Sequence, residues 1–328
     1  MDVSAGAAAR ILQMPAACLK YLNQAAVRPP CDLNSFAGAG DIVAQPKKDA
    51  PMPQAPSAPT DQAAYWNKTG GQAWVDLQDM MDTLNRPIEE ALVERAFPGV
   101  GKRVLDIGCG AGATTLAMAR RLGPDGLSLG VDISAPLIEI AAAQLTQGAQ
   151  FVQADAQTYD FAGAQFDAAI SRFGVMFFGD FDAAFANIRS GLKPGAELVF
   201  ACWRSPADNP MAVIPGRAAA PFLPPAPPAD PLAPGRFAFA DAERVRGILA
   251  RSGWGDIDIT RLDAPTPIAL PDLVTLSLRM GPVAAALREA DETTRGKVRE
   301  AVETALEAEA VDGVVPMVAG CWLVTARA

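Results

Sequence analysis

The stretch Val104-Leu105-Asp106-Ile107-Gly108-Cys109-Gly110-Ala111-Gly112 decides the fold. An apolar run that ends in a glycine-rich segment is typical of a buried strand that turns into a helix. Glycines at such a turn let the backbone pass close to a ligand and leave N–H groups exposed at the helix start. Gly108, Gly110 and Ala113 also satisfy the loose form of the dinucleotide-binding pattern. A tight strand–helix turn without a ligand has the same glycines, so this stretch alone leaves both interpretations open.

Strand and helix signals alternate after this stretch. Short apolar runs predict strands, and the amphipathic segments between them predict helices. The predicted strands are 103–107, 127–131, 149–153, 166–171 and 197–203, and the predicted helices are 114–122, 136–147 and 181–191. This alternation predicts an α/β fold with a doubly wound, mostly parallel sheet and right-handed crossovers.

The flanking segments predict helices and a proline-rich lid. Residues 61–100 predict an N-terminal helical segment, with one helix through Val75 to Leu84 and a second over 88–96. Residues 206–235 contain ten prolines, too many for a helix or a central strand. We expect a substrate lid from 206–240 and 265–310. The remaining predicted elements are a helix at 241–252, a strand at 256–261, helices at 270–287 and 293–308 with a break at Pro282, and a last strand at 320–326.

Residues 1–60 differ in composition from the rest of the chain. They are rich in Pro and Ala and show no sustained periodicity, which predicts a mostly disordered leader. One hypothesis is that synthesis starts at Met52. The domain prediction is therefore a leader at 1–60 followed by one domain at 61–328, whose cofactor-binding core is 101–205.

Three carboxylates stand at the ends of predicted strands. Asp106 precedes the first glycine, Asp132 ends the second strand and Asp155 follows the third. In a doubly wound sheet these strand ends share one edge, next to the point where ligands bind, and a carboxylate after the second strand suits a ribose diol. Each Asp alone could be a turn residue or a helix cap. Together, in register, they favour a ligand site.

These residues carry a resemblance to a known family. Residues 61–328 resemble a class I S-adenosylmethionine-dependent methyltransferase, of the group related to the ubiquinone and menaquinone C-methyltransferases. The resemblance rests on the stretch at 104–112, Gly-Val-Asp-Ile-Ser at 130–134, Ala-Asp-Ala at 154–156, Phe-Asp-Ala-Ala-Ile-Ser-Arg-Phe-Gly at 166–174 and Leu-Lys-Pro-Gly-Ala-Glu-Leu-Val at 192–199. It implies a seven-stranded sheet with an antiparallel last strand, S-adenosyl-L-methionine as cofactor and S-adenosyl-L-homocysteine as product.

The resemblance also implies roles for individual residues. Asp106 and the backbone of 108–112 would hold the methionine end of the cofactor, Asp132 the ribose, and Asp155 the adenine amino group. Ile133 would pack on adenine, the Ala156 N–H would donate to a ring nitrogen, and residues 171–173 would lie beside the methyl group. The segment from Tyr65 to Trp74 would cover the cofactor, although its two tryptophans could equally serve only to anchor a helix. The candidate cofactor-binding residues are Tyr65, Trp66, Gly71, Asp106, Gly108, Cys109, Gly110, Asp132, Ile133, Asp155, Ala156, Ser171, Arg172 and Phe173.

Composition excludes several kinds of enzyme. The chain contains no histidine, which removes Ser-His-Asp and Cys-His nucleophile pairs, a histidine base and His-ligated metal centres. No metal site is therefore expected, and no catalytic side chain stands out. Methyl transfer fits this composition, because in-line displacement at a sulfonium methyl group requires mainly alignment and the exclusion of water.

The net charge and the cysteines restrict which classes of partner and which cellular location are expected. The net charge of −9 argues against a nucleic-acid footprint, and no apolar run is long enough to span a bilayer. Five scattered cysteines without a CxxC pair favour a reducing, cytoplasmic setting. The expected partner is a small acceptor, apolar or aromatic, and candidate acceptor-pocket residues are Met176, Phe177, Phe178, Met211, Phe222 and Leu223. The oligomeric state is not predicted.

Two other functions stay open at this stage. An NAD(P)-dependent oxidoreductase has a similar sheet, although the Tyr-x-x-x-Lys pair and the histidine of common dehydrogenases are absent here. A catalytically silent protein with the same cofactor fold, acting as a binding or assembly factor, would carry the same motifs. Cofactor binding without turnover would favour the silent protein.

Overall fold

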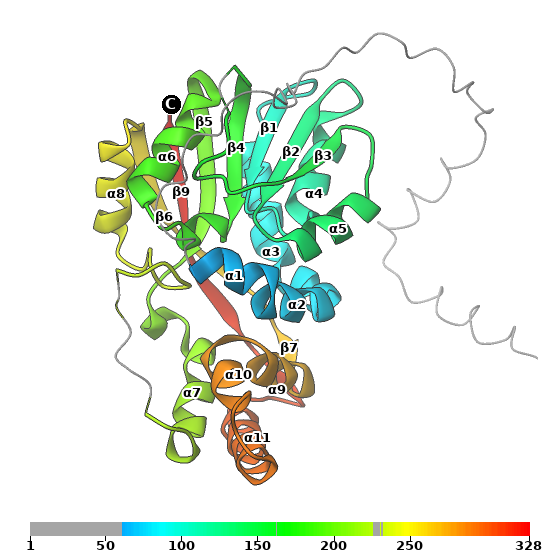
Figure 1. Cartoon of the computed structure of the whole chain (residues 1–328), viewed down its shortest axis with the longest axis vertical. Coiled ribbons are helices and arrows are strands. Elements are labelled where there is room, and N and C mark those ends of the chain that lie inside the picture. Colours follow the sequence, from blue (N-terminus) through cyan, green and yellow to red (C-terminus); the bar gives the residue numbers. More distant parts are fainter. Residues whose placement is uncertain (1–60, 162, 226–229, 231) are drawn as a thin grey trace, which may run out of the picture. The chain divides into compact units, whose positions relative to one another are not determined.

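A computed structural model describes residues 61–161, 163–225, 230 and 232–328. Contacts divide the chain after Pro51, and all of the described residues belong to the second unit, Met52–Ala328. The predicted leader lies outside the described residues. The second unit contains a seven-stranded sheet, and the glycine-rich turn follows one of its strands (Figure 1).

The strand order is β3-β2-β1-β4-β5-β9-β6. The first five of these strands pair in parallel, whereas β9 runs antiparallel to both β5 and β6. The strands are β1 (Arg103–Ile107), β2 (Leu127–Asp132), β3 (Ala149–Gln153), β4 (Phe166–Arg172), β5 (Leu192–Trp203), β6 (Gly255–Pro265) and β9 (Val318–Arg327). The predicted doubly wound, mostly parallel sheet with an antiparallel last strand is confirmed.

Helices cover both faces of the sheet because neighbouring strand residues point to opposite faces. Val104, Ala168 and Val199 pack in one apolar cluster with α3 (Gln78–Ala96) and α4 (Ala113–Leu122). Leu105, Ala169 and Phe200 pack in another, with α6 (Phe181–Ser190) and α8 (Ala242–Arg251). The helix between β2 and β3 is α5 (Ala135–Ala143), which ends earlier than the predicted 147.

The break between the N-terminal helices differs from the prediction. The structure has α1 (Asp61–Asn67), α2 (Thr69–Asp76) and then α3. The helix α3 is a single helix with Pro87 in its interior. The predicted end of a helix before residue 88 is therefore wrong. Buried residues of α3 lie along one continuous stripe, namely Met81, Asn85, Ile88 and Leu92. Burial of this stripe offsets the loss of the backbone hydrogen bond that Pro87 cannot donate.

The proline-rich segment is more helical than predicted. It contains the short 3-10 helices η3 (Pro206–Asp208), η4 (Pro210–Ala212) and η5 (Ala220–Phe222) and one α-helix, α7 (Ile214–Ala219). The expectation of no helix here is thus wrong for α7. Pro215 stands in the first turn of α7, where the missing N–H would have no helical partner in any case.

A further apolar cluster lies among α7 and the helices after β6. These helices are α9 (Leu270–Arg279), α10 (Gly281–Leu287) and α11 (Glu292–Glu307), with the predicted break before Pro282. Their buried residues, including Val298, Val302 and Leu306, cluster with Met80 and Leu84 of α3. A two-stranded sheet of β7 (Ile268–Ala269) and β8 (Val314–Val315) was not predicted, because two-residue strands leave no periodic signal.

None of the described helices is by itself long and apolar enough to cross a bilayer. The pair α9 and α10 satisfies that criterion only jointly, with a bend of 61° between the two helices.

Candidate functional site

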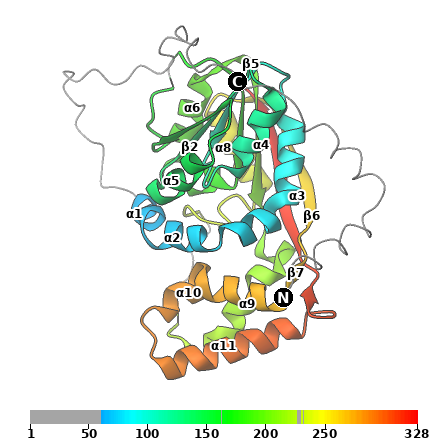
Figure 2. The same ribbon diagram turned by 90° about the vertical axis from the view of Figure 1, so that its right-hand side faces the viewer.

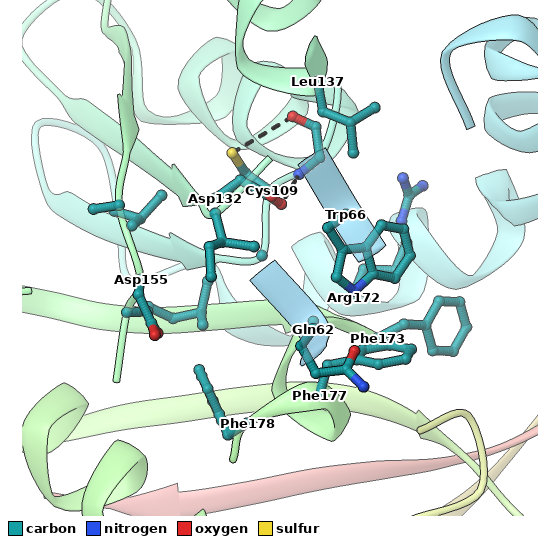
Figure 3. Close-up of a pocket in the computed structure, with 18 of the residues that line it drawn as sticks. Gln62, Trp66, Cys109, Asp132, Leu137, Asp155, Arg172, Phe173, Phe177 and Phe178 are labelled. Carbon is teal, nitrogen blue, oxygen red and sulfur yellow. Dashed lines mark hydrogen bonds between the residues drawn. The ribbon is translucent and has the colours of Figure 1, made fainter. Parts of the chain in front are cut away.

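A pocket lies at the edge of the sheet where the parallel strands β1, β2 and β4 end. It spans about 980 Å³, a volume that includes the open solvent at its mouth. Figure 3 shows Asp132 and Asp155 on one side of the pocket and Trp66, Arg172 and Phe173 on the other. Figures 1 and 2 show α1 and α2 along the same edge of the sheet.

The glycine-rich turn forms the floor of this pocket. Gly108, Gly110 and Gly112 all have positive φ, at 65°, 55° and 92°. A Cβ on Gly108 would come within 2.6 Å of the Gly174 backbone, whereas a Cβ on Gly110 would have no neighbour within 4 Å. Gly108 therefore permits close packing of two backbone turns, and Gly110 leaves its face open to the pocket.

The Asp132 carboxylate is held at the end of β2 by backbone donors. One oxygen accepts from the Ser134 N–H and the other from the Gly110 N–H, both at 2.8 Å. Burial raises the pKa of Asp132, while these N–H donors favour its charged form. Each carboxylate oxygen has a second lone pair, so Asp132 can still accept from two hydroxyl groups of a ligand.

The loop after β3 brings Asp155 and Ala156 to the pocket wall. One Asp155 oxygen accepts from the Gln157 N–H at 2.9 Å, and the side chain of Asn187 in α6 donates to the Ala156 carbonyl at 2.9 Å. The Asn187 amide also donates to the Tyr159 carbonyl at 2.8 Å. The loop conformation is therefore fixed by α6, with the Asp155 side chain at the pocket.

Asp106 lies beneath the pocket floor and does not line the pocket. The side chain is 1% exposed, and one oxygen accepts from the Thr115 hydroxyl at 2.6 Å. The other oxygen has no partner among the described residues. Burial raises the pKa of Asp106 to about 7. Ser171 is likewise fully buried, donating to the Ile107 carbonyl at 2.7 Å and accepting from the Gly174 N–H at 3.1 Å.

Arg172 is the one cation among the described residues that line the pocket. Its guanidinium lies 3.2 Å from a Glu89 oxygen and 3.8 Å from an Asp82 oxygen, both on α3. Burial raises the pKa of Glu89, and the positive charge of Arg172 opposes that shift. The two carboxylates thus hold the guanidinium on the α3 side, at the wall of the pocket.

Aromatic side chains form much of the remaining wall. Trp66 of α1 meets Phe177 edge to face, with ring centroids 5.3 Å apart, so the two close one side of the pocket. Phe173 stacks on Trp203 at 4.6 Å and an interplanar angle of 8°, and the Arg236 guanidinium lies 4.4 Å from the Trp203 ring. This stack holds Phe173 at a φ of 69°, a value rarely adopted by a side-chain-bearing residue.

Ten of the fourteen candidate residues line this pocket. The four that do not are Tyr65, Gly71, Asp106 and Ser171. Tyr65 is 37% exposed and packs against Trp66, while a Cβ on Gly71 would overlap the Trp66 carbonyl oxygen. Gly71 thus permits α2 to fold back on α1.

Several lining residues were not predicted. Leu137, Thr114 and Ala154 follow strand ends whose positions were predicted, so register could have identified them. Gln62 comes from α1 and carries no motif. Among the predicted acceptor residues, Phe177 and Phe178 line the pocket, while Met176 is buried in the core beside it. Met211 and Leu223 pack in the α7–α11 cluster, and Phe222 is exposed.

No group of three His, Cys, Asp or Glu side chains among the described residues could hold a metal ion. The donor set instead fits an adenosyl cofactor. It combines a carboxylate at the end of β2, a second one after β3, an unobstructed glycine turn and a cation at the end of β4.

Comparison with known proteins identifies the domain. Residues 104–195 match a family described as a methyltransferase domain. This segment of the chain is a methyltransferase domain. The predicted resemblance is thereby confirmed, and the matched residues of the domain run from β1 into the start of β5, including the turn, Asp132 and Asp155.

Curated relatives share this part of the chain. The aklanonic acid methyltransferase DauC of Streptomyces sp. (strain C5) is 33% identical over 118 residues, which cover 35% of this chain and 54% of the relative. The 2-phytyl-1,4-naphtoquinone methyltransferase of Nostoc punctiforme is 34% identical over 125 residues, which cover 37% of this chain and 54% of the relative. Each match spans about half of the relative's length.

The fold of the methyltransferase domain also occurs in solved structures. The crystal structure of the cyclase SpnF superposes with a TM-score of 0.50 at 20% identity, covering 82% of this chain and 97% of that chain. This likeness concerns the fold. A cyclase with this fold also shows that the fold alone does not fix the reaction.

Proposed function

We propose that the protein is an S-adenosyl-L-methionine-dependent methyltransferase that acts on a small apolar or aromatic acceptor. The observation that carries the proposal is the placement of Asp132, Asp155, Gly110 and Arg172 around one pocket inside the matched domain. An adenosyl cofactor presents a diol, a purine and an amino acid end, and these four residues offer complementary groups.

In this proposal the Asp132 carboxylate binds the ribose hydroxyls. Asp155 and the Ala156 N–H contact the purine edge, with Ile133 packing on its face. Arg172 would bind the cofactor's carboxylate. When bound, S-adenosyl-L-methionine supplies an electrophilic methyl group.

The residues of the chain would act by alignment and by excluding water. Asp132, Asp155 and Arg172 are the charged residues among those that line the described pocket, and each is assigned to the cofactor. No side chain is thereby left for proton abstraction, so the acceptor would attack the methyl group in line, without a histidine base. Trp66, Phe173 and Phe177 would shield the reacting groups from solvent.

The aromatic wall supports an apolar or aromatic acceptor. Phe177 and Phe178 line the pocket beyond the turn after β4, and the two relatives above are named for aklanonic acid and a naphthoquinone. A small acceptor and a cytoplasmic location belong to this proposal. The three cysteines among the described residues are free thiols, which suits a reducing setting.

Replacement of Asp132 tests the proposal. The Asp132→Ala variant should lose binding of S-adenosyl-L-homocysteine in calorimetry, because the carboxylate that accepts from the ribose is gone. Asp125→Ala is the matched control: Asp125 is exposed and precedes β2, whereas Asp132 ends it, so this variant should bind as the wild type does. Equal affinity of the Asp132→Ala variant and the wild type would contradict the ribose assignment.

A labelled-methyl transfer screen over phenols, quinones, amines and thiols identifies the acceptor. Cofactor binding without transfer to any member would favour the silent binding protein. Binding of NADH in place of S-adenosyl-L-homocysteine would favour the oxidoreductase.

A further inference from the structure

Asn67, the last residue of α1, forms hydrogen bonds with the loop after β2 through both the oxygen and the nitrogen of its side-chain amide. The amide oxygen accepts from the Ala135 N–H at 2.9 Å, and the amide nitrogen donates to the Ile133 carbonyl at 2.9 Å. The same nitrogen donates to the Ala63 carbonyl within α1 at 2.9 Å. One side chain thus joins the helix that covers the pocket to the two backbone groups that flank Ser134.

Ser134 adds a third bond between the same two segments. Its hydroxyl donates to the Trp66 carbonyl at 2.7 Å, and the side chain is fully buried. A Cβ on Gly71 would lie 2.8 Å from this hydroxyl oxygen, so the absence of a side chain there permits the close approach. The three bonds join residues 66–67 to residues 133–135, and we call this set of contacts the latch.

The latch and the ligand-binding groups share one segment of chain. Asp132 accepts from the Ser134 N–H, and both Asp132 and Ile133 line the pocket. Across the pocket, Trp66 precedes Asn67 and meets Phe177. Fastening α1 to residues 133–135 therefore positions the Trp66 wall and the Asp132 carboxylate at the same time.

We propose that Asn67 is a positioning residue that holds α1 over the pocket, so that an adenosyl cofactor leaves only after the latch opens. This inference rests on the proposed function. Binding and latch closure are linked, since a ligand that needs Asp132 and Trp66 in place favours the closed latch, and the closed latch favours the ligand to the same degree. The Asp132 carboxylate and α1 then bind or release the ligand together.

The test measures the release of S-adenosyl-L-homocysteine by stopped-flow displacement, followed by tryptophan fluorescence. The Asn67→Ala variant loses both amide bonds to the loop and should release the ligand roughly tenfold faster, since each hydrogen bond has a modest net strength. The dissociation constant should also rise, because the closed latch favours the bound ligand. Asn67→Asp keeps an acceptor for the Ala135 N–H but sets a carboxylate against the Ile133 carbonyl, so its release should also be faster.

Asn209→Asp is the matched control. Asn209 also uses both ends of its amide on a backbone, donating to the Gly320 carbonyl and accepting from the Gly320 N–H, each at 2.9 Å, but it does not line the pocket. This variant should lower the melting temperature and leave the release rate unchanged.

The outcomes separate the inference from the proposed function. Faster release in the Asn67 variants, with unchanged release in the Asn209 control, supports the latch. A wild-type release rate in both Asn67 variants overturns it, and so does an equal acceleration in the Asn209 control, which would indicate general destabilisation. A wild type that does not bind S-adenosyl-L-homocysteine contradicts the proposed function itself, and the latch with it.

Discussion

Asp106 shows how far a motif predicts the place of a side chain. Its position at the end of β1 follows from the apolar run before it, but in the structure its carboxylate accepts from Thr115 and does not line the pocket. Tertiary packing decided the side-chain direction, because the helix that supplies Thr115 closes over the strand end. One Asp106 oxygen stays without a partner among the described residues, which is costly for a buried charge.

This burial predicts a pH dependence of stability. The pKa of Asp106 is about 7 in the folded protein and near the ordinary 3.8 when unfolded, so the folded state binds more protons between these values. The contribution of Asp106 to the free energy of unfolding should therefore fall as the pH rises from about 4 to 7, by roughly 2–4 kcal/mol. Urea unfolding of the wild type and the Asp106→Asn variant at pH 5 and pH 8 measures this contribution. Identical pH dependence in the two proteins would contradict it.

Other residues of the site were predictable to different degrees. Asp132 and Asp155 follow from strand register alone, since parallel strands bring their carboxyl ends to one edge. Asn67 could not be found in this way. Its role comes from a contact between segments 66 residues apart in the sequence, and an asparagine at a helix end carries no sign of such a partner.

At the scale of elements, strands were easier to predict than helix ends. The bounds of β1 to β4 were predicted to within one residue. The failure at Pro87 has a clear cause. Proline usually ends a helix, but the stripe through Ile88 and Leu92 buries both side chains completely and keeps α3 continuous.

The continuity of α3 leads to a prediction about Pro87. In the Pro87→Ala variant, residue 87 can donate to the Thr83 carbonyl, so the free energy of unfolding should rise by about 1–3 kcal/mol. Urea unfolding measures the change. Pro271→Ala is the control, because Pro271 lies in the first turn of α9, where no such bond is missing, and it should have a neutral or slightly destabilising effect. A loss of stability in the Pro87→Ala variant would contradict this account of α3.

At the scale of the whole molecule, the apolar clusters of the described residues are divided between the sheet and the helices after it. Two clusters pack on the two faces of the sheet, and another joins α7, α9, α10 and α11 to the first turns of α3. An ion pair between Arg279 of α9 and Asp76 of α2 also links these helices to the segment that covers the pocket. This separation suits a lid that recognises the acceptor while the sheet binds the cofactor.

Two leucine variants test this division. Leu306 in α11 and Leu92 in α3 are both fully buried, and replacement of either by alanine should cost about 2–5 kcal/mol of stability. Only Leu306→Ala should raise the KM for the acceptor found in the methyl-transfer screen, while its affinity for S-adenosyl-L-homocysteine stays at the wild-type value. An acceptor KM that is unchanged in Leu306→Ala would contradict the lid assignment.

The position of β9 has a consequence for the order of events during synthesis. β6 leaves the ribosome before β9, yet the two strands that β9 joins, β5 and β6, do not pair with each other. Until residues 318–327 have emerged, one edge of β5 is therefore unpaired and β6 has no strand to pair with. A nascent chain stalled before residue 318 should expose these edges to chaperones and to aggregation. The sheet becomes complete only when this strand inserts.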